Sequence, residues 1–161
     1  MNELIREQHH RLPAELYRGF HVVSFTACLK DRTAFFSTMD RFKTFEGILL
    51  AEVRRFECAA EVYLFMPNHV HTLLRGESES ADVLKAMREF KRKTGYWLAR
   101  NQMSVHWQKD FYDHVLRGNE ELETHIRYLL NNPVRKGLVE VWKEYPFKGS
   151  TVHRLDEWSI A

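Results

Sequence analysis

The sequence predicts an α+β fold, in which an antiparallel sheet carries helices packed mainly on one face. Three observations support this class. Segments rich in β-branched and aromatic residues alternate with long segments of helical periodicity. A Pro-Asn pair separates two strand-like runs closely enough to form a hairpin. The 161 residues, 44% of them hydrophobic, are enough for one buried core and contain no internal repeat or linker.

The first strand is predicted over residues 19–30 and the first helix over residues 37–57. The strand segment is rich in β-branched and aromatic residues. Ser37, followed three residues later by Asp40, resembles a capping box at the start of a helix. An apolar stripe at helical spacing then runs through Phe42, Phe45, Leu49, Val53 and Phe56.

A hairpin and a second helix follow in the sequence. Residues 59–66 and 69–75 have the composition of two strands, and Pro67-Asn68 suits the central positions of a tight turn between them. Helical periodicity resumes over residues 80–101. The residues expected to face inward from this second helix are Val83, Met87, Phe90 and Trp97.

An irregular segment with a short strand is predicted over residues 105–118, and a third helix over residues 119–132. Asn119 is the expected N-cap of this helix, and Pro133 is expected to end it. The resulting order of elements is typical of a ferredoxin-like or RRM-like sandwich, with a further helix near the C-terminus.

We expect a single domain over residues 1–161, with a flexible arm at 1–18 and a tail at 150–161. The two cysteines, Cys28 and Cys58, form no CxxC pair, which excludes a cysteine-based zinc site and favours reduced thiols. The N-terminus lacks the apolar region of a signal peptide, and no apolar run reaches the roughly 18 residues of a membrane span. These features predict a cytoplasmic protein without a membrane partner.

Two histidines lie in the apolar run "MPNHVHTLL", residues 66–74. Because side chains alternate between the faces of a strand, His69 and His71 are expected to share one face. Two neighbouring imidazoles are close enough to bind one metal ion. The alternative is a pair of hydrogen-bonded histidines at the rim of the sheet, and the two residues alone leave both interpretations open.

The third predicted helix places a tyrosine outside its apolar stripe. The residues of this stripe are Leu122, Ile126, Leu129 and Leu130. Tyr128 lies on nearly the opposite side of the helix, and Asn132 follows it one turn later. If that side meets the histidine pair, a phenol and an amide oxygen lie beside the metal site. The alternative is a surface tyrosine and an asparagine that merely ends the helix.

Basic residues concentrate on the second predicted helix, although the formal net charge of the chain is only +2. Such a local excess is typical of a surface that contacts nucleic-acid phosphates. The alternative is an ordinary solvated helix face. The candidate nucleic-acid-binding residues on this helix are Lys85, Arg88, Lys91 and Arg92, and Lys109 and Arg135 extend the set.

Three motifs together resemble one known family. The segments "FMPNHVHTLLR", "VHWQKDFYDHVLR" and "IRYLLNNPVRKGLV" are similar to the REP-associated tyrosine transposases, which are single-tyrosine HUH transposases related to the IS200/IS605 group. The resemblance extends over residues 19–150. It implies an enzyme that cuts and rejoins single-stranded, hairpin-bearing DNA. It also implies that His69 and His71 are the HUH histidines, Tyr128 the nucleophile and Asn132 the residue that completes the metal site.

The resemblance implies Mg²⁺ or Mn²⁺ as the cofactor, and the imidazole ligands alone favour Mn²⁺. It implies a 5′-phosphotyrosine intermediate, which conserves the energy of the cleaved bond for rejoining. Two other functions stay open: a hairpin-binding, repressor-like module without catalysis, and a small HUH replication initiator. The sequence leaves open whether the chain is a monomer or a homodimer.

Overall fold

The structure is a computed structural model, and it describes residues 11–159. Its centre is an antiparallel sheet of five strands in the order β4-β1-β3-β2-β5. The strands are β1 (Val22–Cys28), β2 (Cys58–Met66), β3 (His69–Gly76), β4 (Tyr112–Leu116) and β5 (Lys148–Gly149). The helices are α1 (Met39–Arg55), α2 (Val83–Arg100), α3 (Asn119–Leu130) and α4 (Asn132–Arg135). The predicted fold class is confirmed.

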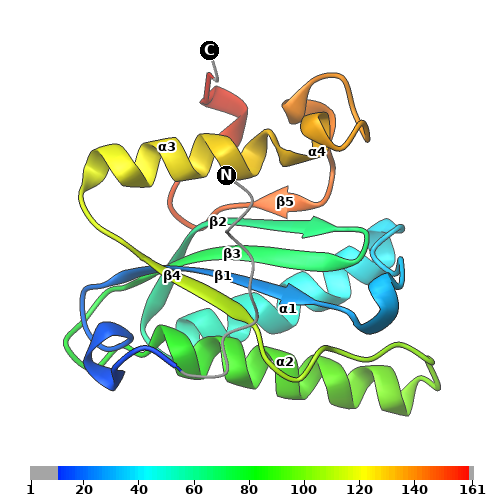
Figure 1. Cartoon of the computed structure of the whole chain (residues 1–161), viewed down its shortest axis with the longest axis horizontal. Helices are drawn as coiled ribbons and strands as arrows, with labels where there is room; N and C mark the ends of the chain where they lie inside the picture. The colour runs from blue at the N-terminus through cyan, green and yellow to red at the C-terminus, as the bar shows by residue number, and fades with distance from the viewer. Residues whose placement is uncertain (1–10, 160–161) are drawn as a thin grey trace.

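The two faces of the sheet carry different helices. The long helices α1 and α2 cover one face, and α3 with α4 lies across the other (Figure 1). On β3, the side chains of Val70 and Leu74 belong to the core cluster beneath α1 and α2. Leu73 belongs to the cluster beneath α3. Side chains alternate between the two faces of a strand, so His69 and His71 lie on the same face as Leu73. This is the face covered by α3.

Helix capping differs from the prediction at two positions. Thr38, not Ser37, caps α1, because its Oγ1 accepts the hydrogen bond from the backbone N–H of Arg41. The Ser37 hydroxyl instead contacts the carbonyl of Phe35. Gly118, with a φ of 83°, precedes α3 in place of the expected cap Asn119. A glycine adopts this backbone conformation without steric cost, so the chain can turn sharply from β4 into α3.

Pro133 begins a short helix as well as following a long one. Helix α3 ends at Leu130, and α4 starts at Asn132 with Pro133 in its first turn. A proline is tolerated there because its missing N–H has no intrahelical acceptor in the first turn. The chain therefore continues in a new helical turn, which places Asn132 and Arg135 beside the end of α3.

The 105–111 segment belongs partly to the core. Trp107 is 9% exposed, and its indole N–H donates a 2.9 Å hydrogen bond to Oγ1 of Thr94 on α2. Two backbone contacts hold this segment to the end of β1. Leu29 and Trp107 form an isolated β-bridge, and the N–H of Gln108 donates a hydrogen bond to the carbonyl of Cys28. Trp107 is therefore part of the core beneath α1 and α2.

Both ends of the described chain pack against the sheet. Of the arm predicted at 1–18, residues 1–10 lie outside the described residues. In the remainder, Tyr17 is buried and Arg11 forms a 2.7 Å ion pair with Asp113 on β4. Of the tail predicted at 150–161, the last two residues likewise lie outside the described part. The sequence did not predict β5, which is too short to have a recognisable pattern.

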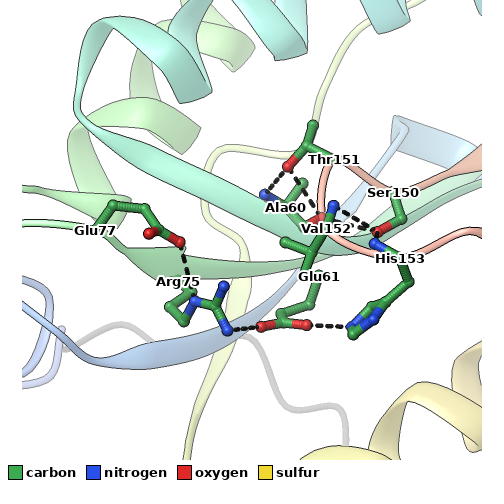
Figure 2. A network of polar contacts seen from close by, with 8 residues as sticks. All are labelled: Ala60, Glu61, Arg75, Glu77, Ser150, Thr151, Val152 and His153. Atoms are coloured by element: carbon green, nitrogen blue, oxygen red, sulfur yellow. Dashed lines mark hydrogen bonds and ion pairs between the residues drawn. The ribbon is translucent and has the colours of Figure 1, made fainter.

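The C-terminal segment is tied to β2 by a polar network (Figure 2). Glu61, a fully buried carboxylate at the irregularity in β2, accepts hydrogen bonds from Arg75 on β3 and from His153. Thr151 bonds the backbone of the neighbouring Ala60. Burying a carboxylate is costly unless it has hydrogen-bond partners, so the bond from His153 to Glu61 helps specify where this segment docks.

Two other sequence-based expectations concern the thiols and the membrane. Cys28 and Cys58 are both half-buried, and neither is part of a disulfide bond. Within residues 11–159, no helix has both the length and the apolar character that a membrane-spanning helix requires.

Candidate active site

The imidazoles of His69 and His71 meet at the start of β3. Their Nε2 atoms lie 3.1 Å apart, and the two rings are nearly perpendicular, at 89°. Two ligands on adjacent positions of an ion, each bonded at about 2.1 Å, lie about 3 Å apart. The separation of the two nitrogens therefore fits a shared metal ion.

The opposite ring nitrogens have hydrogen-bond partners that orient both rings. Nδ1 of His69 lies 2.6 Å from Oδ1 of Asn68, and Nδ1 of His71 lies 2.9 Å from Oγ1 of Thr26 on β1. An amide oxygen only accepts hydrogen bonds, so Nδ1 of His69 is the donor and its Nε2 carries the lone pair. This is the arrangement in which a histidine binds a metal through Nε2.

Burial keeps both imidazoles uncharged. It lowers the pKa of His69 to about 4, with a smaller contribution from the charge of Lys136. Burial also lowers the pKa of His71 well below its usual value, and the neighbouring His69, His125 and Arg135 lower it further. Both nitrogens can therefore act as ligands at neutral pH without first releasing a proton.

The structure brings Asn132 to the histidine pair. Its side chain is 7% exposed, and its amide nitrogen lies 3.3 Å from Nε2 of His71. A rotation of the amide by 180° presents the oxygen instead, which is the atom that can bind a metal. Among residues 11–159, no three His, Cys, Asp or Glu side chains are close enough to hold an ion, so a third protein ligand from that part of the chain requires a residue such as Asn132.

Tyr128 lies on α3, and its ring contacts two other side chains. Its side chain is 53% exposed. The Arg135 guanidinium lies over one ring face at 3.9 Å from the centroid, and the ring of His125 is stacked with it at 6.2 Å. His125 is itself fixed to β1 by a 2.8 Å hydrogen bond with Ser24. The tyrosine that the helical pattern placed outside the core is therefore accessible to solvent, and its ring packs against Arg135 and His125.

A cleft of about 600 Å³ opens beside His69. Its walls come from the end of β1, the β2–β3 turn, the 108–112 segment and the chain after α4. Arg32 and Lys136 contribute positive charge, and none of the lining residues is acidic. Such a cleft favours an anionic ligand. Arg32 has no recognisable role in the sequence, because only the folded chain places the turn after β1 next to His69.

The comparison with known families decides the identity of the chain. The profile of a family described as "Transposase IS200 like" matches residues 20–132, which is more than half of the sequence. The chain belongs to the IS200-like transposase family. The matched region includes all three residues of the histidine–asparagine cluster and Tyr128, and it confirms the resemblance found in the sequence motifs.

Individual relatives agree with the assignment of this chain to the transposase family. A REP-associated tyrosine transposase of Escherichia coli K12 is 27% identical over 143 residues, covering 86% of this chain and 82% of the relative. A Haemophilus influenzae protein of the same description is 26% identical over 141 residues, covering 81% and 78%. A solved REP-associated tyrosine transposase, bound to a REP hairpin, has the same fold, with a TM-score of 0.73, 20% identity and coverage of 89% and 82%.

The predicted basic surface of this transposase lies apart from the histidines. Helix α2 covers the face of the sheet opposite to α3 (Figure 1). Lys91 is engaged within the chain, since its ammonium lies 2.8 Å from the carbonyl oxygen of Gln108. Arg92 pairs with Glu89 at 2.7 Å. The structure thus separates the predicted DNA-contacting residues of α2 from the metal-site candidates.

The other predicted contacts have mixed surroundings. Lys85, Arg88 and Lys109 are exposed. Arg135 contacts the ring of Tyr128. The sequence-based set is therefore divided among solvent, the loop before β4 and the site itself.

Proposed function

We propose that this transposase is a metal-dependent endonuclease and strand transferase for single-stranded DNA that carries a hairpin. Tyr128 is its nucleophile, and His69, His71 and Asn132 hold the metal ion. The observation that carries this proposal is the pair of Nε2 atoms 3.1 Å apart, with the Asn132 amide 3.3 Å from that of His71. Mg²⁺ or Mn²⁺ fits the donor set of two imidazoles and an amide oxygen, and the imidazoles favour Mn²⁺.

A bound divalent cation would supply charge neutralisation at the scissile phosphate and at the leaving oxygen. The residues of this chain would perform the remaining steps. The phenolic oxygen of Tyr128 attacks phosphorus and loses its proton to water. The bond from phosphorus to the 3′ oxygen breaks, and that oxygen takes up a proton to become a 3′-OH. A 5′-phosphotyrosine bond replaces the phosphodiester, so attack by another 3′-OH reverses the step and joins two strands.

Two features support DNA as the substrate. A relative with the same fold is a transposase bound to a REP hairpin. In this chain, Arg32 and Lys136 line the cleft beside His69 without an acidic neighbour in its wall, which suits the phosphates of an unpaired strand. We propose Lys85, Arg88 and Lys109 as outer phosphate contacts. An activity on DNA also agrees with the cytoplasmic location expected from the sequence.

The experiment that tests the proposal is the detection of a covalent protein–DNA adduct. The protein is incubated with a labelled single strand that carries a hairpin, together with Mn²⁺ or Mg²⁺, and then denatured in SDS. We expect an adduct with the wild type, no adduct with Tyr128→Phe and none with EDTA. Tyr96→Phe is the matched control, because Tyr96 is 62% exposed and lies on α2, and it should form the adduct normally.

Two outcomes contradict the proposal. An adduct that persists in Tyr128→Phe assigns the nucleophile to another residue. Hairpin binding without an adduct under any of the metal conditions instead favours the binding module without catalysis. Replacing His69 and His71 with alanine separates these cases further, because it should abolish the adduct while leaving a pure binding function intact.

A further inference from the structure

Arg135 makes three contacts that converge on the proposed catalytic residues. Its guanidinium lies over the ring of Tyr128, with Cζ 3.9 Å from the centroid. One terminal nitrogen donates a 2.8 Å hydrogen bond to the backbone carbonyl of Tyr128. The same nitrogen lies 3.2 Å from Oδ1 of Asn132. One side chain therefore contacts both the nucleophile and the candidate third metal ligand.

These contacts distinguish Arg135 from other cations near the site. Lys136 follows it in the chain and lines the cleft. Arg127 is exposed on α3, next to Tyr128 in sequence, and within residues 11–159 its side chain forms no hydrogen bond or ion pair. Of these three cations in the described chain, Arg135 is the one whose side chain reaches back from α4 to the end of α3. Its position thus differs from that of a cation directed outward to a phosphate.

We infer that Arg135 is a positioning residue for the Tyr128 nucleophile, an inference that rests on the proposed function. The last carbonyls of a helix lack partners within the helix, and Arg135 supplies one to the carbonyl of Tyr128. The planar guanidinium covers one face of the phenol and limits its rotation. The Tyr128 ring is thereby held in a fixed orientation at the end of α3.

The expected consequence of losing Arg135 is a defect in the chemical step. A misplacement of about 1 Å in a reacting group can lower a rate by about a hundredfold. Binding of DNA through the cleft does not require this guanidinium, because Arg32 and Lys136 provide the positive charge there. Loss of Arg135 should therefore slow cleavage without weakening DNA binding. Loss of a phosphate contact would instead weaken DNA binding.

The first test compares Arg135→Met and Arg135→Lys with the matched control Arg127→Met. We expect both Arg135 variants to cleave saturating DNA at least about tenfold more slowly than the wild type. Their dissociation constant for hairpin DNA, and its dependence on salt, should stay unchanged. The lysine retains the charge but cannot lie flat on the ring while bonding the carbonyl, so it should not restore the rate. Arg127→Met should cleave normally.

A phosphate contact gives the opposite pattern and overturns the inference. Loss of one such contact weakens DNA binding and reduces the slope of affinity against salt by about one unit, which Arg135→Lys would restore. A normal cleavage rate in Arg135→Met also overturns it. Mn²⁺ binding, measured by titration, should not weaken in Arg135→Met, because the arginine competes for the Asn132 oxygen.

A second measurement tests the contact without any DNA or activity. The protein is labelled with 3-fluorotyrosine, and the resonance of Tyr128 is assigned with Tyr128→Phe. We expect this resonance to shift in Arg135→Met and to stay in place in Arg127→Met, because the guanidinium lies directly over the Tyr128 ring. An unchanged resonance in Arg135→Met would show that the contact is absent. If instead the wild type forms no adduct while this shift occurs, the proposed function fails and the contact stands.

Discussion

Oγ1 of Thr26 on β1 lies 2.9 Å from Nδ1 of His71 on β3, directly across the pair of strands. This hydroxyl fixes the orientation of a buried imidazole whose Nε2 faces that of His69. A partner behind a metal-binding histidine typically changes metal affinity by 10- to 100-fold. The contact therefore gives the first prediction.

Thr26→Val should weaken Mn²⁺ binding by about 10- to 100-fold, since it keeps the shape of the side chain but removes the hydrogen bond to His71. Titration of Mn²⁺ measures the effect. Thr26→Ser retains a hydroxyl and should bind Mn²⁺ nearly as the wild type does. Equal affinities for all three proteins would show that this hydroxyl does not support the site.

Metal binding should be almost independent of pH near neutrality. The folded pKa of His69 is lowered to about 4, and that of His71 is also lowered, so neither proton is present to compete at pH 6. We expect Mn²⁺ affinity to change less than about twofold between pH 8 and pH 6, and to fall as the pH approaches 4. Two imidazoles with the usual pKa of about 6.5 would lose roughly tenfold or more over the same range.

Lys91 should support the wall of the cleft rather than bind DNA. Its ammonium lies 2.8, 3.2 and 3.3 Å from the carbonyl oxygens of Gln108, Lys109 and Asp110, and Gln108 lines the cleft. Lys91→Met should speed amide hydrogen exchange in the 106–112 segment and weaken DNA binding. The salt dependence of binding should not change, because no phosphate contact is lost.

The matched control for this prediction is Lys85→Met, which removes an exposed charge from the same helix. If Lys85 contacts phosphate, this variant should reduce the salt slope by about one unit and leave hydrogen exchange of the 106–112 segment unchanged. A reduced salt slope in Lys91→Met, together with faster hydrogen exchange in Lys85→Met, would contradict the roles given to these two lysines.

The network around Glu61 should stabilise the docked C-terminal segment (Figure 2). His153→Ala removes one of two partners of a fully buried carboxylate and should lower the free energy of unfolding by about 1–3 kcal/mol. Arg154→Ala is the control, because the side chain of Arg154 is 81% exposed and its ion pair with Glu157 is worth little. Urea denaturation compares the variants, and equal stabilities would exclude a structural role for the network.

Several parts of the site could be predicted from local pattern. The alternation of a strand places His69 and His71 on one face, and the helical period places Tyr128 outside the apolar stripe. Both follow from backbone geometry within one element. Helix caps were less predictable, because Thr38 and Ser37 are adjacent and equally suited by residue type, and only the backbone at the start of α1 selects Thr38.

The basic residues show where a local pattern is insufficient. Lys85 and Lys91 look alike in the sequence, yet one is exposed and the other contacts three carbonyls. Arg135 lies next to Lys136, yet it contacts Tyr128 while its neighbour lines the cleft. A charged side chain is long, and its partners come from distant segments, so the residue type does not determine the contact.

The sequence by itself determined the order of elements as far as α3, the paired imidazoles, the tyrosine outside the core and the resemblance to a transposase family, because short-range periodicity and motif spacing record these features. Only the tertiary structure decided that α3 covers the histidine face, that Asn132 and Arg135 return to Tyr128, and that Arg32 enters the cleft. These features depend on which faces of the sheet bury their apolar residues and on contacts between segments up to about a hundred residues apart, which no local pattern encodes.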